Sequence, residues 1–281
     1  MVSSVRMAFA EYKRWLFNPR IVLLIALIIF ARESVGQFLC EHAKDMDMNM
    51  QIFEPYIALC NSYVVILVTP IFYLVMMADF PVMEGSYMWA ISRMGKKEWI
   101  FSQFILSVMC GVTIQICLFI SSFISCFGYL EYKNTWSEVI TQYYLKFPEK
   151  AGSDVTSLIS GDIYNQMTPM TAMVYTFTLS LLSMILLSML LMCGKIYARR
   201  YLSFAVCLVI TGVGATFRAI NIDAKWVFPS ANAVVGGHFY EFADKSYKSM
   251  GYSYEYFVIL ILVIIFISYI GMKRGNICRK L

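Results

Sequence analysis

Six stretches of this chain are apolar over a length that suits a membrane crossing. A bilayer core about 30 Å thick needs about 20 apolar residues in a helix. The stretches are Ile21–Leu39, Tyr56–Ala78, Trp99–Tyr129, Thr171–Met192, Tyr201–Ile220 and Tyr254–Met272. They lack the alternating segments of about ten residues that are typical of β-barrels. We therefore predict an all-α integral membrane protein with six transmembrane helices, in which residues 1–281 form a single domain.

Two of these stretches have features that bear on their geometry. Trp99–Tyr129 exceeds a straight crossing, which indicates tilt or an end outside the membrane. Tyr56–Ala78 contains Pro70, and we expect this proline to be the only candidate break within a span.

Residues 1–19 mix apolar and basic side chains ahead of the first span. Trp15 follows Lys13 and Arg14, and Asn18-Pro19 marks a break. This composition predicts an amphipathic helix lying along the inner membrane surface. The alternative is an ordinary cytoplasmic leader to the span. No small-residue cleavage site follows the apolar run, so we expect the first span to be retained rather than removed as a signal peptide.

Composition and charge support the membrane assignment and predict its orientation. The chain is 59% hydrophobic and only 15% charged, with a net charge of +5. Lys and Arg are enriched in cytoplasmic loops. Residues placed on one side by the six spans are Arg6, Lys13, Arg14, Arg20, Arg93, Lys96, Lys97, Lys195, Arg199, Arg200, Lys273, Arg274, Arg279 and Lys280. We therefore predict a multi-pass protein of the cell membrane with both termini cytoplasmic, and we read the net charge as a topology signal without nucleic-acid binding.

Motifs for catalysis and metal binding are missing. The sequence has no HExxH or GxSxG pattern, and neither Gly95-Lys96 nor Gly194-Lys195 continues into the Ser or Thr of a phosphate-binding loop. The eight cysteines form no CxxC pair and are expected to pack as small buried residues. The methionine-rich run 45–50 is interpreted as a polar outer loop, with Cu(I) binding as the alternative. We expect no catalytic residue, no metal site and no cofactor in this chain.

The segment 79–99, between the second and third spans, carries the most informative pattern. Ser86 suits the start of a short helix and Gly95 its end. The segment resembles the coupling-helix loop of type-2 ABC exporter permeases, in which an acidic residue and Gly-Ser or Gly-Thr open a short helix that ends in Ser-Arg and is followed by Lys. The positions that match this loop or supply its apolar contacts are Glu84, Gly85, Ser86, Tyr87, Met88, Ser92, Arg93 and Lys96.

The resemblance extends to the topology and implies partners. An inner-surface helix, six spans and short re-entrant outer helices within 221–253 would be shared with this family. The family likeness implies a second, identical or related permease subunit and two cytoplasmic ATPase subunits, which bind ATP and Mg²⁺. The outer segment 130–169 is longer than in compact members, and is either a lid over the exit or a plain tether.

These features predict the membrane subunit of an ATP-driven exporter. The apolar, Met-rich and aromatic spans suit a hydrophobic or amphipathic cargo, such as a bacteriocin, a cytolytic peptide or a lipophilic drug. A secondary transporter and a membrane scaffold or sensor without transport are the alternatives. Discontinuous helices near the midplane would favour the secondary transporter.

Ionisable residues near the outer ends of spans are candidates for a gate. Burying a charge in a membrane is unfavourable, so such residues are rarely without a role. Arg32 and Glu33 lie in the first stretch and Arg218 in the fifth. We hypothesise that Glu33 pairs with Arg218 to hold an outer mouth closed, with interfacial anchoring as the alternative.

Overall fold

The computed structural model describes residues 2–83, 92–150, 159–239 and 246–274. The α-helices are α1 Val2–Leu16, α2 Val22–Ala31, α3 Gln37–Met46, α4 Glu54–Asn61, α5 Tyr63–Met76, α7 Lys96–Ser125, α8 Glu138–Lys146, α9 Gly161–Tyr164, α10 Pro169–Ile196, α11 Arg200–Ala219, α12 Pro229–Asn232 and α13 Met250–Lys273. Short 3₁₀ turns are η1 Pro19–Ile21, η3 Pro148–Lys150, η4 Asp223–Val227 and η5 Val235–His238, and η2 Arg32–Gly36 is a π-helical turn. A single parallel pair joins β1 Met50–Gln51 to β2 Leu130–Glu131.

The protein is an all-α membrane protein, as predicted. In the described residues, five helices are long and apolar enough to cross a membrane, or six if the bent pair α4–α5 counts as one span. They include a continuous 28-residue rod, Pro19–Met46, which joins η1, α2, η2 and α3. The other four are α7, α10, α11 and α13. Each of the six predicted stretches therefore corresponds to one long helix or to the bent pair.

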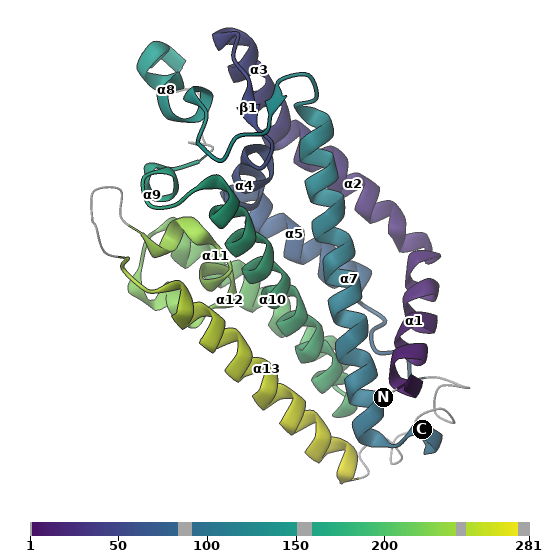
Figure 1. Cartoon of the computed structure of the whole chain (residues 1–281). Helices are drawn as coiled ribbons and strands as arrows, with labels where there is room; N and C mark the ends of the chain where they lie inside the picture. Colours follow the sequence, from purple (N-terminus) through teal and green to yellow (C-terminus); the bar gives the residue numbers. More distant parts are fainter. Residues whose placement is uncertain (1, 84–91, 151–158, 240–245, 275–281) are drawn as a thin grey trace.

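Helix α10 forms the centre of the bundle, with α7, α11 and α13 packed around it (Figure 1). Its side chains are buried on several faces, including Leu179 and Met189. Helices α11 and α13 instead expose apolar side chains such as Val209 and Leu262. Because such a surface is unfavourable in water, these outer faces fit contact with lipid tails.

The basic residues gather at one end of this bundle. This end carries α1, the start of α7, the end of α10, the start of α11 and the end of α13 (Figure 1). We name it the basic end and its opposite the far end. Arg93, Lys195, Arg200 and Lys273 all belong to the basic end.

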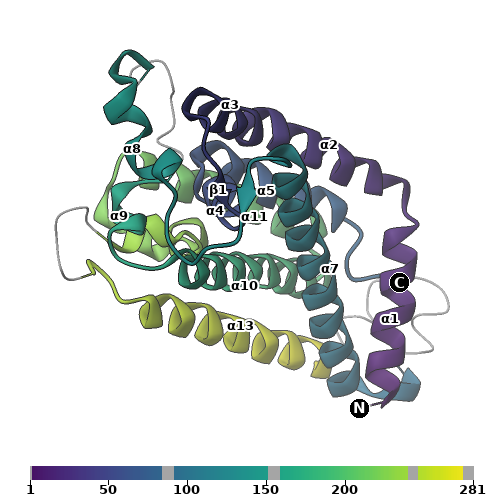
Figure 2. The same ribbon diagram turned by 45° about the horizontal axis from the view of Figure 1, so that its top comes forward.

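The first helix, α1, packs along the beginning of α7, as Figure 2 also shows. Gln103 Nε2 donates to Glu11 Oε2 at 3.0 Å, and the hydroxyls of Tyr12 and Thr113 are 2.5 Å apart. The predicted break is present at Asn18-Pro19. There, Asn18 Oδ1 accepts a hydrogen bond from Arg20 N at 2.9 Å, within the turn η1 that precedes α2. A helix is present within residues 1–19, as predicted; Ser4, Ala8 and Glu11 are buried, whereas Val5 and Phe9 are exposed.

The predicted second span is not a continuous helix, and in this respect the prediction was wrong. Helices α4 and α5 meet at an angle of 79°. The chain turns at Ser62, whose ψ of 131° is extended rather than helical. Asn61 stabilises the turn, because its Nδ2 donates to Ile57 O at 2.8 Å and its Oδ1 accepts from Gly236 N at 3.3 Å. Pro70, the expected break, instead lies inside α5.

The outer segment 130–169 is folded onto the far end. It contains β2, α8 and α9 in its described parts. The buried carboxylate of Glu54 accepts from Ser137 N at 2.6 Å and from Ser137 Oγ at 2.7 Å. Tyr143 OH donates to Asp45 Oδ2 at 2.7 Å. These bonds attach α8 to both α3 and α4, so the described part of the segment packs on the far end, and we name it the packed cap.

The segment 221–253 forms short helices beside α11. Its turns η4, α12 and η5 surround the buried side chain of His238. Asn232 Nδ2 donates to two backbone carbonyls, and Asn232 Oδ1 accepts from Ser253 Oγ at 2.8 Å. His238 Nε2 lies 2.7 Å from the same hydroxyl. Burial lowers the pKa of His238 to about 4, aided by nearby cations, so this histidine is neutral at pH 7.

Candidate functional site

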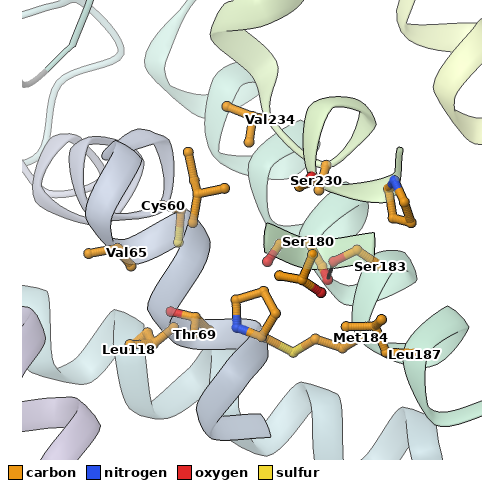
Figure 3. A pocket seen from close by; sticks show the side chains of 15 residues that line it. Cys60, Val65, Thr69, Leu118, Ser180, Ser183, Met184, Leu187, Ser230 and Val234 are labelled. Carbon is orange, nitrogen blue, oxygen red and sulfur yellow. Dashed lines mark hydrogen bonds between the residues drawn. The ribbon is translucent and has the colours of Figure 1, made fainter. Parts of the chain in front are cut away.

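A small cavity lies beside the break between α4 and α5. Its volume is about 40 Å³, which is room for about two or three water molecules. Figure 3 shows Cys60 and Thr69 on one side and Ser180, Ser183 and Ser230 on the other. These residues come from α4, α5, α10 and α12, so the cavity is enclosed by elements distant in the sequence.

Two hydroxyl groups at this cavity lack protein partners. Thr69 Oγ1 and Ser230 Oγ are buried and make no hydrogen bond with any residue that the structure describes. A buried hydroxyl without a partner is unfavourable by about 1 to 3 kcal/mol. The cavity is therefore a polar site inside an apolar bundle, suited to water or to the polar group of a passing molecule.

Polar side chains continue from the cavity into the bundle. Tyr56 OH donates to Gln115 Oε1 at 2.8 Å, and Gln115 Nε2 donates to Ser180 Oγ at 2.5 Å. This chain joins α4, α7 and α10 through side chains that are buried or nearly so. A second bond, between Tyr73 and Ser188, joins α5 to α10. Hydrogen bonds in a low-dielectric interior fix the relative positions of helices, so both halves of the bent pair are attached to α10.

A second candidate site lies at the basic end, where Asp79 opens the segment 79–99. Its carboxylate contacts Arg20 at 2.7 Å and Arg200 at 2.6 Å. Lys195 Nζ donates to the backbone oxygen of Asp79 at 2.9 Å. The three cations come from η1, the end of α10 and the start of α11. We name these four residues the Asp79 cluster; it attaches the start of the loop to three separate elements.

The sequence prediction missed Asp79. Its signal was present, because Asp79 is one of few acidic residues among many basic ones on that side of the chain. An isolated acid in such surroundings is expected to pair with the cations. Which cations it meets depends on the packing of α2, α10 and α11, which the sequence does not reveal.

Only part of the predicted ATPase-coupling set is described. Glu84, Gly85, Ser86, Tyr87 and Met88 lie outside the described residues. Ser92, Arg93 and Lys96 are described and exposed at the basic end, next to the start of α7. Gly95 separates them with a positive φ of 87°, which favours glycine, so the turn into α7 is fixed by this residue.

In the described part of the chain, no ion pair joins Glu33 to Arg218. Arg32 and Glu33 are exposed on the π-helical turn η2. The guanidinium of Arg218 lies 5.1 Å from the ring centroid of Tyr63, at the start of α5. The structure therefore places Arg218 on the bent pair and not beside Glu33.

Comparison with known proteins gives no relative: no family model, no curated protein and no solved structure matches the chain. Function must therefore be argued from the two sites. One is a polar cavity at a helix break. The other is the Asp79 cluster, which attaches the start of segment 79–99 to the bundle. The first is lined by the hydroxyl groups of Thr69, Ser183 and Ser230 and the second is held by ion pairs.

Proposed function

We propose that this chain is the membrane subunit of an ATP-driven exporter of the type-2 ABC class. The observation that supports this most is the Asp79 cluster. A force applied to the segment that follows Asp79 would reach η1, α10 and α11 together, through Arg20, Lys195 and Arg200. A loop that couples an ATPase to membrane helices needs such an attachment, and a passive linker does not.

The cavity supplies a place where movement would matter. It lies between the bent pair and α10, and α5 also packs on α11, which begins at the Asp79 cluster. Displacement of α11 or α10 would change the separation of Thr69 and Ser183. In this proposal, ATP-driven closure of two partner ATPases acts on residues 79–99, and the cavity opens into a path shared with a second permease subunit.

The distribution of charge and the exposed apolar side chains assign the two ends to membrane sides and indicate the class of cargo. The basic end faces the cytoplasm of the cell, with α1 on that side of the membrane. Short helices at 221–253 form the outer re-entrant segment, and the packed cap at 130–169 lies over the exit. Cargo is a hydrophobic or amphipathic molecule, such as a bacteriocin, a cytolytic peptide or a lipophilic drug, because the described spans expose apolar side chains and few charges.

Isolation of the tagged chain from its native membrane tests the proposal. We expect an ATPase to be retained, and Arg93→Glu to reduce its recovery by about tenfold, because a reversed charge at an interface opposes a complementary partner. Lys133→Glu is the matched control, since Lys133 is exposed at the far end. The exporter function would be refuted if no ATPase is retained and if ATP does not support transport by the purified complex.

A secondary transporter is the second candidate, and the break at Ser62 favours it. Discontinuous helices place polar backbone groups at substrate sites in many secondary transporters. The α4–α5 pair has such a break, next to a cavity lined by hydroxyls. Proteoliposomes that contain only this chain discriminate the two functions. Cargo uptake driven by an ion gradient without ATPase would support the second candidate, and its absence would support the first.

A further inference from the structure

A groove runs along the lipid-facing surface between α7 and α13. These helices approach each other at the basic end and diverge toward the far end (Figures 1 and 2). The groove has a volume of about 430 Å³. Phe101 and Phe104 line one wall, Ile261 and Ile265 line the other, and Leu182 of α10 lies between the two walls.

The polar groups of the groove are confined to one end. Lys97 and Tyr269 both line it, and Lys97 Nζ lies 5.7 Å from the ring centroid of Tyr269. The other lining side chains are apolar. Glu98, the next residue of α7, accepts from Ser3 of α1 at 2.6 Å and does not line the groove. The polar end of the groove is therefore positively charged.

The length of the groove matches one leaflet of a bilayer. From Tyr269 to Val258, α13 rises by about 16 Å at 1.5 Å per residue, and half of the hydrocarbon core is about 15 Å. The amine of Lys97 lies at the end where the basic residues gather, at the level expected for lipid head groups. An acyl chain that starts at Lys97 would reach the middle of the membrane near Val258.

We propose that the α7–α13 groove binds one acyl chain of an anionic phospholipid, with the phosphate-bearing head group at Lys97. The apolar walls contact the chain, and the aromatic ring of Tyr269 supports the amine beside the phosphate. Zwitterionic lipids fit the same walls, but their phosphate is offset by a cationic group. The inference does not depend on the exporter function, because it rests on the shape and charge of this groove alone.

Photolabelling in vesicles tests the site. The full chain is reconstituted in phosphatidylcholine containing a trace of phosphatidylglycerol or phosphatidylcholine with a photoactivatable group in the middle of its acyl chain, and labelled peptides are identified by mass spectrometry. A lysine near a membrane surface contributes about 1 kcal/mol to anionic lipid binding. We therefore expect phosphatidylglycerol to label the α7 and α13 peptides about fivefold more than phosphatidylcholine does.

Four variants make the experiment specific. Lys97→Ala should reduce labelling by phosphatidylglycerol to the level of phosphatidylcholine, whereas Lys97→Arg should retain the preference. Lys96→Ala is the matched control, because Lys96 is exposed on the same turn but does not line the groove. Leu262→Trp should fill the groove and reduce labelling by both lipids. Equal labelling by the two lipids, or a preference that survives Lys97→Ala, would overturn the proposal.

Discussion

Replacement of Asp79 by asparagine should loosen the attachment of the loop at the basic end. The side chain of Asp79 is 47% exposed, and those of Arg20 and Arg200 are 36% and 39% exposed. An ion pair at this exposure contributes about 0.2 to 1 kcal/mol. Asp79→Asn removes the charge from both pairs but leaves the backbone oxygen that Lys195 contacts. The two pairs together therefore contribute about 0.4 to 2 kcal/mol, and their loss should lower Tm by about 1 to 8 °C.

Intrinsic tryptophan fluorescence of the purified protein during heating measures this change. The difference in Tm between Asp79→Asn and the wild type should shrink in about 0.5 M salt, because salt screens partly exposed charges. Glu131→Gln is the control: it removes a single, more exposed pair with Lys133 at the far end and should lower Tm by at most about half as much as Asp79→Asn does. Stabilisation by these ion pairs is refuted if Asp79→Asn has the Tm of the wild type at low salt. It is also refuted if the decrease in Tm of the Asp79→Asn, Arg200→Gln double variant equals the sum of the two single decreases.

Three further predictions concern the far end and the helix contacts. Gly214→Ala should destabilise the protein by about 1 to 3 kcal/mol, since its Cβ would lie 2.0 Å from Ser230 Oγ; Gly212→Ala, which meets nothing within 4 Å, should leave Tm unchanged or slightly higher. Because the pKa of His238 is lowered to about 4 from 6.5, its own contribution to stability is complete above pH 6.5 and declines as the pH falls toward 4, by up to about 3 kcal/mol; the difference in Tm between the wild type and His238→Gln should therefore be largest near pH 7 and shrink toward pH 4. Glu54→Ala removes the acceptor at the start of α8, so limited proteolysis within 130–169 should be about tenfold faster, and an unchanged rate would contradict the proposed docking of the cap.

The positions of the long helices could be predicted from the sequence because hydropathy and helix length are local properties. The predicted stretch Tyr254–Met272 lies within α13, and Thr171–Met192 lies within α10. Breaks are harder to predict, because hydropathy averages over them. Tyr56–Ala78 is apolar enough on average to pass as one span, yet the chain turns at Ser62. Asn61 and Ser62 both compete for backbone hydrogen bonds, and this dipeptide was the available signal.

Contacts between helices could be predicted less well, because they depend on how each helix is rotated. Glu33 and Arg218 were expected to meet from their depth alone, but Arg218 contacts the ring of Tyr63 instead. The π-helical turn η2 contributes to this error, since it changes the direction in which Glu33 projects from the first span. Asp79 shows the opposite case: its charge is evident in the sequence, whereas its three partners appear only after α10 and α11 are packed.

Helix α7 runs from the basic end to the far end as one uninterrupted helix. Its 30 residues are helical without interruption, so it is about 45 Å long. Just beyond its far end, Tyr129 O accepts from Met50 N at 2.7 Å, and the strand that contains Met50 leads directly into α4. A tilt of about 10° at the basic end would displace the other tip by about 8 Å. A change in the tilt of α7 at the basic end would therefore move the strand that leads to the break at Ser62.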